Sequence, residues 1–270
     1  MNADQWRAVA EEFEAKWQFP HCVGAIDGKH VKIQPPPGSG SYYLNYKGCH
    51  SIVLMAVANA NYEFIYIDVG ANGRVSDGGV WGNCTLSKCL DEENNAGLPP
   101  PAMLKKSAEF LRYVFVADDA FPLKTNLMKP FPFRNQTDEQ RIYSYRLSRV
   151  IRIIENSFGI MGSRFRVLST TIALTPEKVE KIVLACAVLH NVLRKCALEE
   201  YNQPGTMDEE NEETGVLHRG TWRKDGTMLP LQTTETRNPS IEAKNIRNKF
   251  CHYFNNEGQV PWQMRMAGIE

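Results

Sequence analysis

The sequence predicts a mixed α/β fold in which a sheet is flanked by helices. Between residues 22 and 117, short β-prone apolar runs alternate with turn-forming residues, a pattern typical of strands. In the second half of the chain, apolar residues recur at helical spacing over longer segments. The chain has 270 residues. On a prior of roughly 100 to 200 residues per domain, this leaves room for one large domain with appendages.

Four strands are expected from the apolar runs. They are residues 22–33, 49–58, 64–69 and 113–117. The second and third flank the turn-like sequence Asn59-Ala60-Asn61 and should pair as an antiparallel hairpin, which forms a meander with the first. Glycine lets the backbone bend, so the first strand is expected to be interrupted at Asp27-Gly28.

Helices are expected around these strands. They are residues 4–17, 80–90, 141–158, 175–193 and 240–254. The helix at 141–158 has the clearest period, because its apolar side chains form one stripe and Gly159 follows as a stop signal. Glu155 lies about 40° around the helix from Ile151, at the rim of that stripe. A carboxylate in this position is neither fully buried nor freely solvated.

The pattern divides the chain into four parts. The expected parts are an N-terminal helix (1–20), an α/β domain (21–198), an acidic flexible linker (199–234) and a C-terminal helix and tail (235–270). Seven acids and no base lie between Glu199 and Glu213. Such a tract should not bury enough apolar surface to order itself. The prediction is therefore an α/β core with a C-terminal helical extension.

Composition excludes several classes of protein. No apolar run approaches the ~18 residues of a membrane span, and no secretory signal begins the sequence, which favours a reducing compartment. The seven cysteines show no C-x-x-C spacing, which argues against a disulfide framework or a zinc site. The net charge of the chain is zero, yet the segment between Ala120 and Arg166 contains nine Lys or Arg residues and only three acidic residues. A basic region of this kind suits a polyanionic substrate.

Three acids stand where rigid elements could bring them together. Asp27 and Asp118 each follow an apolar run, and Glu155 lies on the helix at 141–158. The elements follow one another in the order of an RNase H-like domain. This order is a hairpin with a third strand, then a helix, then an isolated strand, and then further helices. In that fold the first and fourth strands are neighbours, which would place Asp27 beside Asp118. Converging carboxylates favour hard divalent cations such as Mg²⁺, and a pair of such ions can promote phosphodiester cleavage.

Basic residues near these acids are the predicted DNA contacts. They are Lys124, Lys129, Arg149, Arg152, Arg164 and Arg166. Each of them alone is better explained as a solvated charge or a structural ion pair, but as a group they favour DNA binding. His190 lies on an apolar helix and is expected to be a hydrogen-bonded core histidine rather than a metal ligand.

An ordered series of motifs resembles the PIF/Harbinger superfamily of DDE transposases and their domesticated nuclease relatives. The resemblance runs from about Phe19 to Leu198. The motifs are Gly24-Ala-Ile-Asp-Gly-Lys-His30, Tyr46-Lys-Gly-Cys-His-Ser51, Ser76-Asp-Gly-Gly-Val-Trp81, Ala117-Asp-Asp-Ala-Phe-Pro-Leu123, Glu155-Asn-Ser-Phe-Gly159, Arg164-Phe-Arg166 and Leu189-His-Asn191. No single motif is specific, whereas the ordered series is.

The resemblance implies an RNase H-like nuclease that depends on Mg²⁺ or Mn²⁺, with two ions when DNA is bound. It makes Asp27, Asp118 and Glu155 the catalytic DDE triad and the metal ligands, and it favours Asp118 over its neighbour Asp119. It also implies a location in the nucleus, and to a lesser extent the cytoplasm, with a Myb-like DNA-binding partner protein and the option of a homodimer. The family usually carries a helix-turn-helix-like region before the first catalytic strand. Fewer than thirty residues precede Asp27, so site-specific DNA recognition by this chain alone is not expected.

The leading hypothesis is therefore a metal-dependent DNA endonuclease or transposase catalytic domain, capable of strand transfer if a 3′-hydroxyl replaces water as the nucleophile. The alternative is a domesticated DNA-associated or adaptor protein that retains the scaffold without cleaving. A hydrolase that uses two carboxylates as acid and base on sugars is a weaker third option, because nothing marks an aromatic sugar-binding groove.

Overall fold

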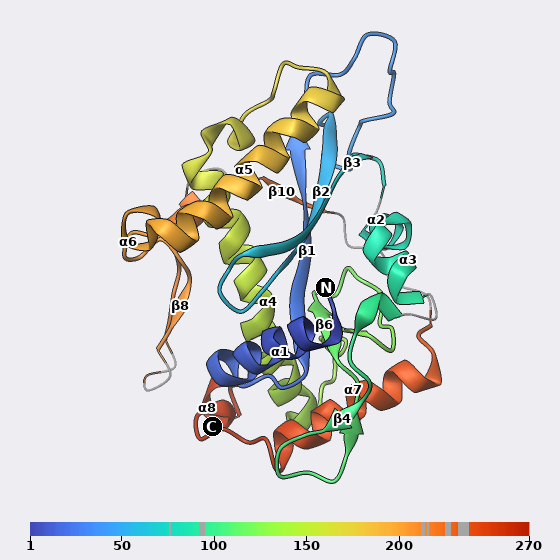
Figure 1. Cartoon of the computed structure of the whole chain (residues 1–270), viewed down its shortest axis with the longest axis vertical. Helices are drawn as coiled ribbons and strands as arrows, with labels where there is room; N and C mark the ends of the chain where they lie inside the picture. Colours follow the sequence, from blue (N-terminus) through green and yellow to red (C-terminus); the bar gives the residue numbers. More distant parts are fainter. Residues whose placement is uncertain are drawn as a thin grey trace.

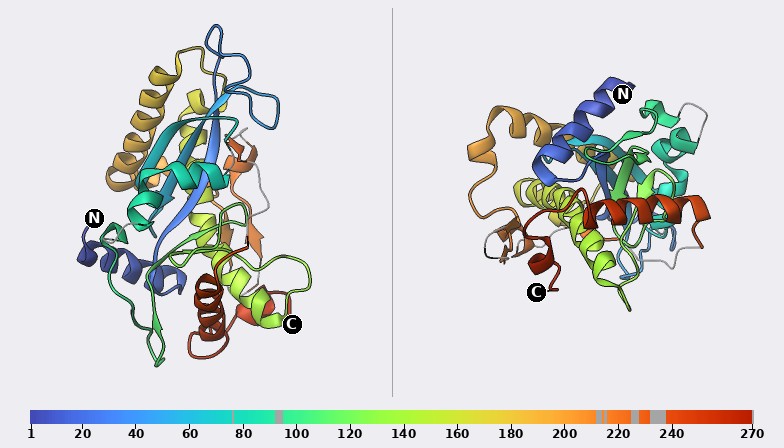
Figure 2. Two further views of the ribbon diagram at one scale, coloured as in Figure 1. Left: turned by 90° about the vertical axis from the view of Figure 1, so that its right-hand side faces the viewer. Right: turned by 90° about the horizontal axis from the view of Figure 1, so that it is seen from below.

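A central mixed sheet with helices on both faces forms the body of the protein (Figures 1 and 2). The computed structural model describes residues 1–75, 77–91, 95–211, 214, 216–224, 228–231 and 238–269. The strands of the sheet lie in the order β3-β2-β1-β6-β7, and β10 pairs with β1. Their bounds are β1 Cys22–Lys32, β2 Ser51–Ala58, β3 Phe64–Asn72, β6 Val114–Ala117, β7 Leu127–Met128 and β10 Leu229–Pro230.

The sheet confirms the predicted α/β fold of RNase H-like type. The predicted hairpin is formed by β2 and β3, which are antiparallel, and β2 is antiparallel to β1. The predicted fourth strand is β6, which lies beside β1 and runs parallel to it. The first and fourth predicted strands are thus neighbours at the centre of the sheet. Two short hairpins lie outside it, formed by β4 (Ala102–Met103) with β5 (Phe110–Leu111) and by β8 (Glu209–Glu210) with β9 (Leu217–His218).

Helices cover the two faces of the sheet differently. The bounds are α1 Ala3–Trp17, α2 Asp77–Asn83, α3 Thr85–Asp91, α4 Asp138–Arg164, α5 Pro176–Cys196, α6 Leu198–Tyr201, α7 Ile241–Asn255 and α8 Gln263–Met266. One apolar cluster joins the sheet to α4, α5 and α7, and the other joins the opposite face to α1, α2 and α3. Side chains of a strand alternate between faces. Ala25 and Val31 of β1 belong to the α4 side, so Asp27 and Lys29 lie on that side too.

The first strand is continuous, which corrects the expectation of an interruption at Asp27-Gly28. Every residue of β1 from Ala25 to Lys32 pairs with β2, and Asp27 is opposite Ala56. A side chain at Gly28 would overlap Leu231, so glycine here admits a close neighbour instead of bending the strand. Asp27 therefore projects from the middle of a strand.

The long helix also differs from expectation. It extends over 27 residues and passes through Gly159, which was predicted to stop it. A side chain at position 159 would overlap the indole ring of Trp222, so the glycine allows a close approach within the helix. The predicted helix at 80–90 is divided into α2 and α3, whereas α1, α5 and α7 confirm the other predicted helices.

The acidic segment 199–234 does not behave as a solvated linker where the structure describes it. Tyr201, Asp208, Trp222, Met228 and Leu231 are all buried. Residues 212, 213, 215, 225–227 and 232–237 of this segment lie outside the described residues. Among the helices that the structure describes, none combines the length and the apolar character that a membrane crossing requires.

Candidate active site

Asp27 and Asp118 are neighbours because of the pairing between β1 and β6. Ile26 and Ala117 are partners in this parallel pair. Asp27 is the next residue of β1, and Asp118 is the first residue after the end of β6. The alternation of side chains puts Asp118 on the same side as Val114 and Val116, which belong to the cluster that contacts α4. Asp27 is on that side as well. Both carboxylates therefore face the helix that carries Glu155.

The three acids influence one another electrostatically. Burial raises the pKa of Asp118 to about 6, and the negative charges of Asp27 and Glu155 contribute to this increase. Burial and the charge of Asp27 also raise the pKa of Glu155. Like charges disfavour one another's ionised forms when they lie close together. The prediction that these three acids share one site is consistent with this coupling.

Lys29 supplies a positive charge close to these acids. Its ammonium nitrogen is 2.5 Å from Oδ2 of Asp27, while Oδ1 of Asp27 accepts a hydrogen bond of 2.6 Å from the Gly28 amide. Burial alone would lower the pKa of Lys29, but the charges of Asp27, Glu155 and Asp118 outweigh this effect and raise it. Lys29 is therefore an ammonium ion that partly neutralises all three carboxylates.

Glu155 has a basic partner of its own. Its Oε2 atom accepts a hydrogen bond of 3.2 Å from Nη2 of Arg223. Lys29, Glu155 and Arg223 line a pocket of about 230 Å³ whose other walls include Phe158, Trp222 and Met228. Within the described residues, no group of three or more His, Cys, Asp or Glu side chains is arranged to hold a metal ion. In this conformation Asp27 and Glu155 are each paired with a basic side chain, whereas Asp118 accepts a hydrogen bond from the Ala120 amide.

Asp119 is placed differently from Asp118. Its side chain is 62% exposed and forms an ion pair of 2.9 Å with Lys129. Asp118 is partly buried, and its Oδ1 atom accepts a hydrogen bond of 3.0 Å from the Ala120 amide. Of the two neighbours, Asp118 is the one whose charge interacts with Asp27 and Glu155. This arrangement favours Asp118 as the member of the acidic site.

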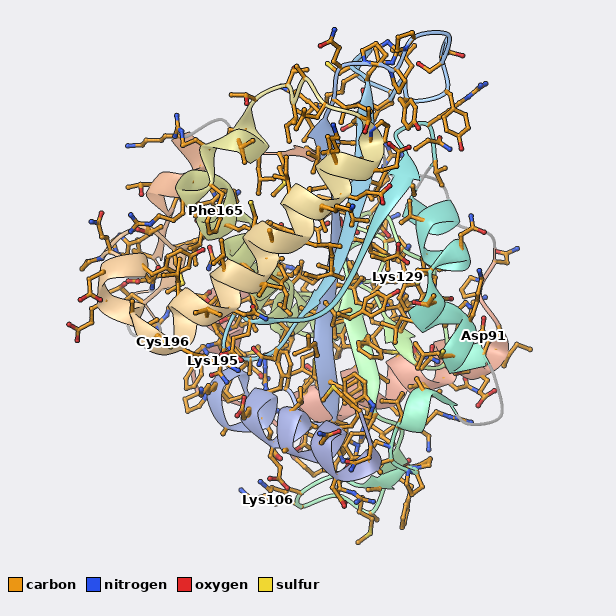
Figure 3. The ribbon with its side chains drawn as sticks, turned by 45° about the horizontal axis from the view of Figure 1, so that its top comes forward. Asp91, Lys106, Lys129, Phe165, Lys195 and Cys196 are labelled. Atoms are coloured by element: carbon orange, nitrogen blue, oxygen red, sulfur yellow. The ribbon has the colours of Figure 1, made fainter. Side chains whose placement is uncertain are left out.

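Two of the predicted DNA contacts on the loop after Asp118 have carboxylate partners. Lys124 pairs with Asp91 at 2.8 Å. The Lys129 side chain is only 9% exposed and binds both the side chain and the carbonyl oxygen of Asp119. Figure 3 shows Lys129 among packed side chains and Asp91 at the surface. Lys129 thus stabilises the loop through its contacts with Asp119. Lys124 is partly exposed, and its contact with DNA remains a prediction.

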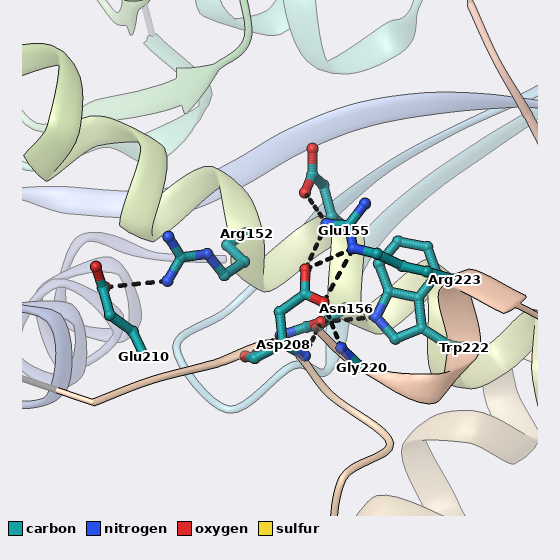
Figure 4. Close-up of polar contacts among 8 residues, drawn as sticks. All are labelled: Arg152, Glu155, Asn156, Asp208, Glu210, Gly220, Trp222 and Arg223. Atoms are coloured by element: carbon teal, nitrogen blue, oxygen red, sulfur yellow. Dashed lines mark hydrogen bonds and ion pairs between the residues drawn. The ribbon is translucent and has the colours of Figure 1, made fainter. Parts of the chain in front are cut away.

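The predicted contacts on α4 and just after its end also separate into two groups. Arg149 and Arg152 are 5% and 14% exposed, and both pair with Glu210, at 3.3 and 3.0 Å. Figure 4 shows the contact between Arg152 and Glu210. This corrects the expectation for Arg149, whose buried guanidinium does not face solvent. Arg164 and Arg166 are exposed and stay predictions, although Arg164 also donates to the carbonyl oxygens of Tyr201 and Glu200.

His190 is a core histidine, as expected. It is fully buried and lies 2.8 Å from both the Tyr201 hydroxyl and the Tyr62 carbonyl oxygen.

Sequence reasoning missed Lys29 and Arg223 as members of the site. Lys29 could have been found, because two residues along a strand from Asp27 its side chain must lie on the same face. Arg223 gave no such signal, since it lies 68 residues after Glu155 in the sequence. It comes from a segment whose composition predicted a linker.

Comparisons with known proteins show the family of the chain. The model of a family described as "DDE superfamily endonuclease" matches residues 26–191, which include all three acids. The Homo sapiens protein named "Putative nuclease HARBI1" is 28% identical over 212 residues, covering 77% of this chain and 56% of that protein. The Xenopus laevis protein of the same name is 26% identical over 213 residues, covering 78% of this chain and 57% of its own length.

A plant relative matches more distantly. The Arabidopsis thaliana protein named "Protein ALP1-like" is 24% identical over 198 residues, covering 70% of this chain and 48% of that protein. The chain thus spans about half the length of the curated relatives that it matches. No solved structure matches the chain. Because the family model covers more than half of the sequence, the chain belongs to the DDE superfamily endonucleases.

Proposed function

We propose that the protein is a metal-dependent DNA endonuclease in which Asp27, Asp118 and Glu155 bind Mg²⁺ or Mn²⁺. The observation that carries this proposal is the parallel pairing of Ile26 with Ala117, which brings Asp27 and Asp118 to one place on the face that α4 covers. Carboxylate oxygens are the donors that these cations prefer. Burial and the neighbouring acids raise the pKa values of Asp118 and Glu155, and a bound cation would favour their ionised forms.

The residues have distinct tasks in this proposal. When bound, the cations would supply the charge that stabilises the attacking and leaving oxygens of the phosphodiester. Asp27 and Asp118 hold their carboxylates on a rigid sheet, and Glu155 approaches from the helix. Lys29 must leave Asp27 for a cation to bind there, and its ammonium then remains beside the site where phosphate would lie. Strand transfer, a nuclear location, a Myb-like partner protein and a homodimer are further parts of the proposal.

One observation fits the alternative of a DNA-associated protein that does not cleave. Asp27 and Glu155 already have the basic partners Lys29 and Arg223, so the site is electrostatically satisfied in part without a cation. Thermal unfolding in a Mn²⁺ titration discriminates between the two functions. A cation that binds the folded protein raises its melting temperature, and this increase should disappear in Asp27→Asn. Equal melting temperatures with and without Mn²⁺ would favour the alternative.

Plasmid nicking tests the proposed activity. We expect the wild-type protein to nick supercoiled plasmid in Mn²⁺, and we expect Asp27→Asn and Asp118→Asn each to lose this activity. The matched control is Asp119→Asn, which removes an exposed acid next to Asp118 and should retain nicking. If Asp27→Asn nicks as fast as the wild type, Asp27 has no role in the reaction.

A further inference from the structure

A segment beyond the family's matched region lies against the acidic site. We call residues 206–224 the strap; of these, 212, 213 and 215 lie outside the described residues. The strap is attached to α4 through Asn156, the residue after Glu155. Asn156 is buried. Its side-chain oxygen accepts a hydrogen bond of 2.9 Å from the Asp208 amide, and its side-chain nitrogen donates one of 3.2 Å to the Asp208 carbonyl oxygen. The indole nitrogen of Trp222 also donates to Asn156, at 3.0 Å.

Asp208 fixes the position of Arg223 within the strap. The Asp208 side chain is fully buried and accepts hydrogen bonds from Nε and Nη2 of Arg223 and from the Gly220 amide. Burial alone would raise the pKa of Asp208, but the hydrogen bonds from Arg223 and Gly220 lower it. The guanidinium also lies over the Trp222 ring, 4.3 Å from its centre. Arg223 is thus held in one orientation before any ligand arrives.

The held guanidinium faces the acidic site. Its Nη2 atom is 3.2 Å from Oε2 of Glu155, and Figure 4 shows Arg223 between Glu155 and Asp208. The side chain is 38% exposed and lines the pocket of about 230 Å³ together with Lys29 and Glu155. Its Nη1 amino group donates to none of the residues that the structure describes. One edge of the guanidinium therefore remains available for an acceptor in this pocket.

We propose that Arg223 is an additional active-site residue that binds a phosphate oxygen of the DNA beside Asp27, Asp118 and Glu155, and that Asp208 positions it. Guanidinium groups match the geometry of phosphate oxygens, keep their charge at all relevant pH values and bind strongly when pre-oriented. A purely structural arginine would be satisfied by Asp208 within the fold. Arg223 instead also contacts Glu155 and lines the pocket shared with Lys29 and Glu155. The inference rests on the proposed function, because it assigns a contact to the same substrate.

The dependence of DNA binding on salt tests this assignment without requiring cleavage. Binding of a fluorescent 30-base-pair duplex of random sequence would be measured in Ca²⁺ at several KCl concentrations. Loss of one phosphate contact should reduce the slope of log K against log [salt] by about 0.9. We expect this reduction in Arg223→Gln, and we expect Arg223→Lys to restore most of the wild-type slope. The control is Arg219→Gln, which removes an exposed arginine of the same strap.

The possible outcomes separate the two proposals. A wild-type slope in Arg223→Gln, or an equal reduction in Arg219→Gln, would overturn the role of Arg223. Failure of Arg223→Lys to restore the slope would also contradict it, since the lysine keeps the charge. Circular dichroism in the near ultraviolet confirms that each variant retains its fold. Absence of plasmid nicking by the wild type would instead reject the proposed nuclease activity, and the slopes would still report on Arg223.

Discussion

Ile26 of β1 and Ala117 of β6 are partners in a parallel strand pair, and both are followed directly by an aspartate. This relationship places Asp27 and Asp118 side by side although 91 positions separate them in the sequence. Asp27 lies within β1 and Asp118 directly follows β6, so the sheet fixes both positions more precisely than distant loop positions would be fixed. Their repulsion is partly compensated by Lys29, whose ammonium contacts Asp27. The site therefore keeps two carboxylates close together in a defined geometry.

Gly159 should be essential for docking the strap on α4. A methyl group at this position would overlap the Trp222 ring, so Gly159→Ala should lower the free energy of unfolding by about 1–3 kcal/mol through overpacking. Chemical denaturation measures this change. The matched control is Gly162→Ala on the same helix, where the nearest contact of a methyl group among the described residues would be Met228 Cε at 4.0 Å. That variant should be as stable as the wild type or more stable by roughly 0.5–1 kcal/mol. Equal effects of both substitutions would argue against a specific contact at position 159.

Glu210 should contribute far more to stability than its neighbour Glu209. The Glu210 side chain is 8% exposed and pairs with the buried Arg149 and with Arg152. Removing one partner of a buried ion pair costs about 3–5 kcal/mol, because the remaining charges lose their compensation. We therefore expect Glu210→Ala to reduce the free energy of unfolding by about 3 kcal/mol. Glu209 is exposed, so Glu209→Ala should change this free energy by less than about 0.5 kcal/mol. Similar values for the two variants would contradict the assigned pairing.

His190 should make the protein less stable as the pH falls. Its Nε2 atom must donate to the Tyr62 carbonyl oxygen, which can only accept, and in the neutral ring Nδ1 then accepts from the Tyr201 hydroxyl. Burial lowers the pKa of His190 from 6.5 to about 4. Between these values the unfolded chain binds more protons than the folded protein, so stability decreases as pH decreases. The contribution is roughly 3 kcal/mol at most.

The variant His190→Gln isolates this contribution. It lacks the titrating ring, so the stability advantage of the wild type over the variant should shrink as the pH is lowered from 6.5 to 4. Urea unfolding at several pH values measures the difference. A difference that stays constant over this range would show that His190 does not titrate as its burial implies.

The sequence predicted most of the sheet because local signals and topology agreed. Apolar runs marked β2, β3 and β6, and the order of elements implied that β1 and β6 are adjacent. Glycine was the main source of error. Gly28 and Gly159 were interpreted as a bend and a stop, whereas each admits a side chain from elsewhere, Leu231 and Trp222 respectively. Such close approaches depend on tertiary contacts that no local pattern contains.

The site was predicted less completely than the fold. The three acids were selected by their positions on strands and a helix, but their basic partners were not. The alternation of side chains along a strand could have predicted Lys29, because it places Lys29 on the same face as Asp27. Arg223 and Asp208 belong to a segment whose acidic composition predicted disorder. The ion pair between Arg223 and buried Asp208, an asparagine on α4 and a tryptophan hold that segment in place. Composition alone does not predict these contacts.

The most direct test of the account is a crystal soaked in saturating Mn²⁺ and measured at a wavelength where manganese scatters anomalously. We predict anomalous density between the carboxylates of Asp27, Asp118 and Glu155, with the Lys29 ammonium displaced from Asp27. Saturated crystals with no such density, in which Lys29 and Arg223 keep their contacts with Asp27 and Glu155, would contradict the claim that these acids form a metal-dependent nuclease site.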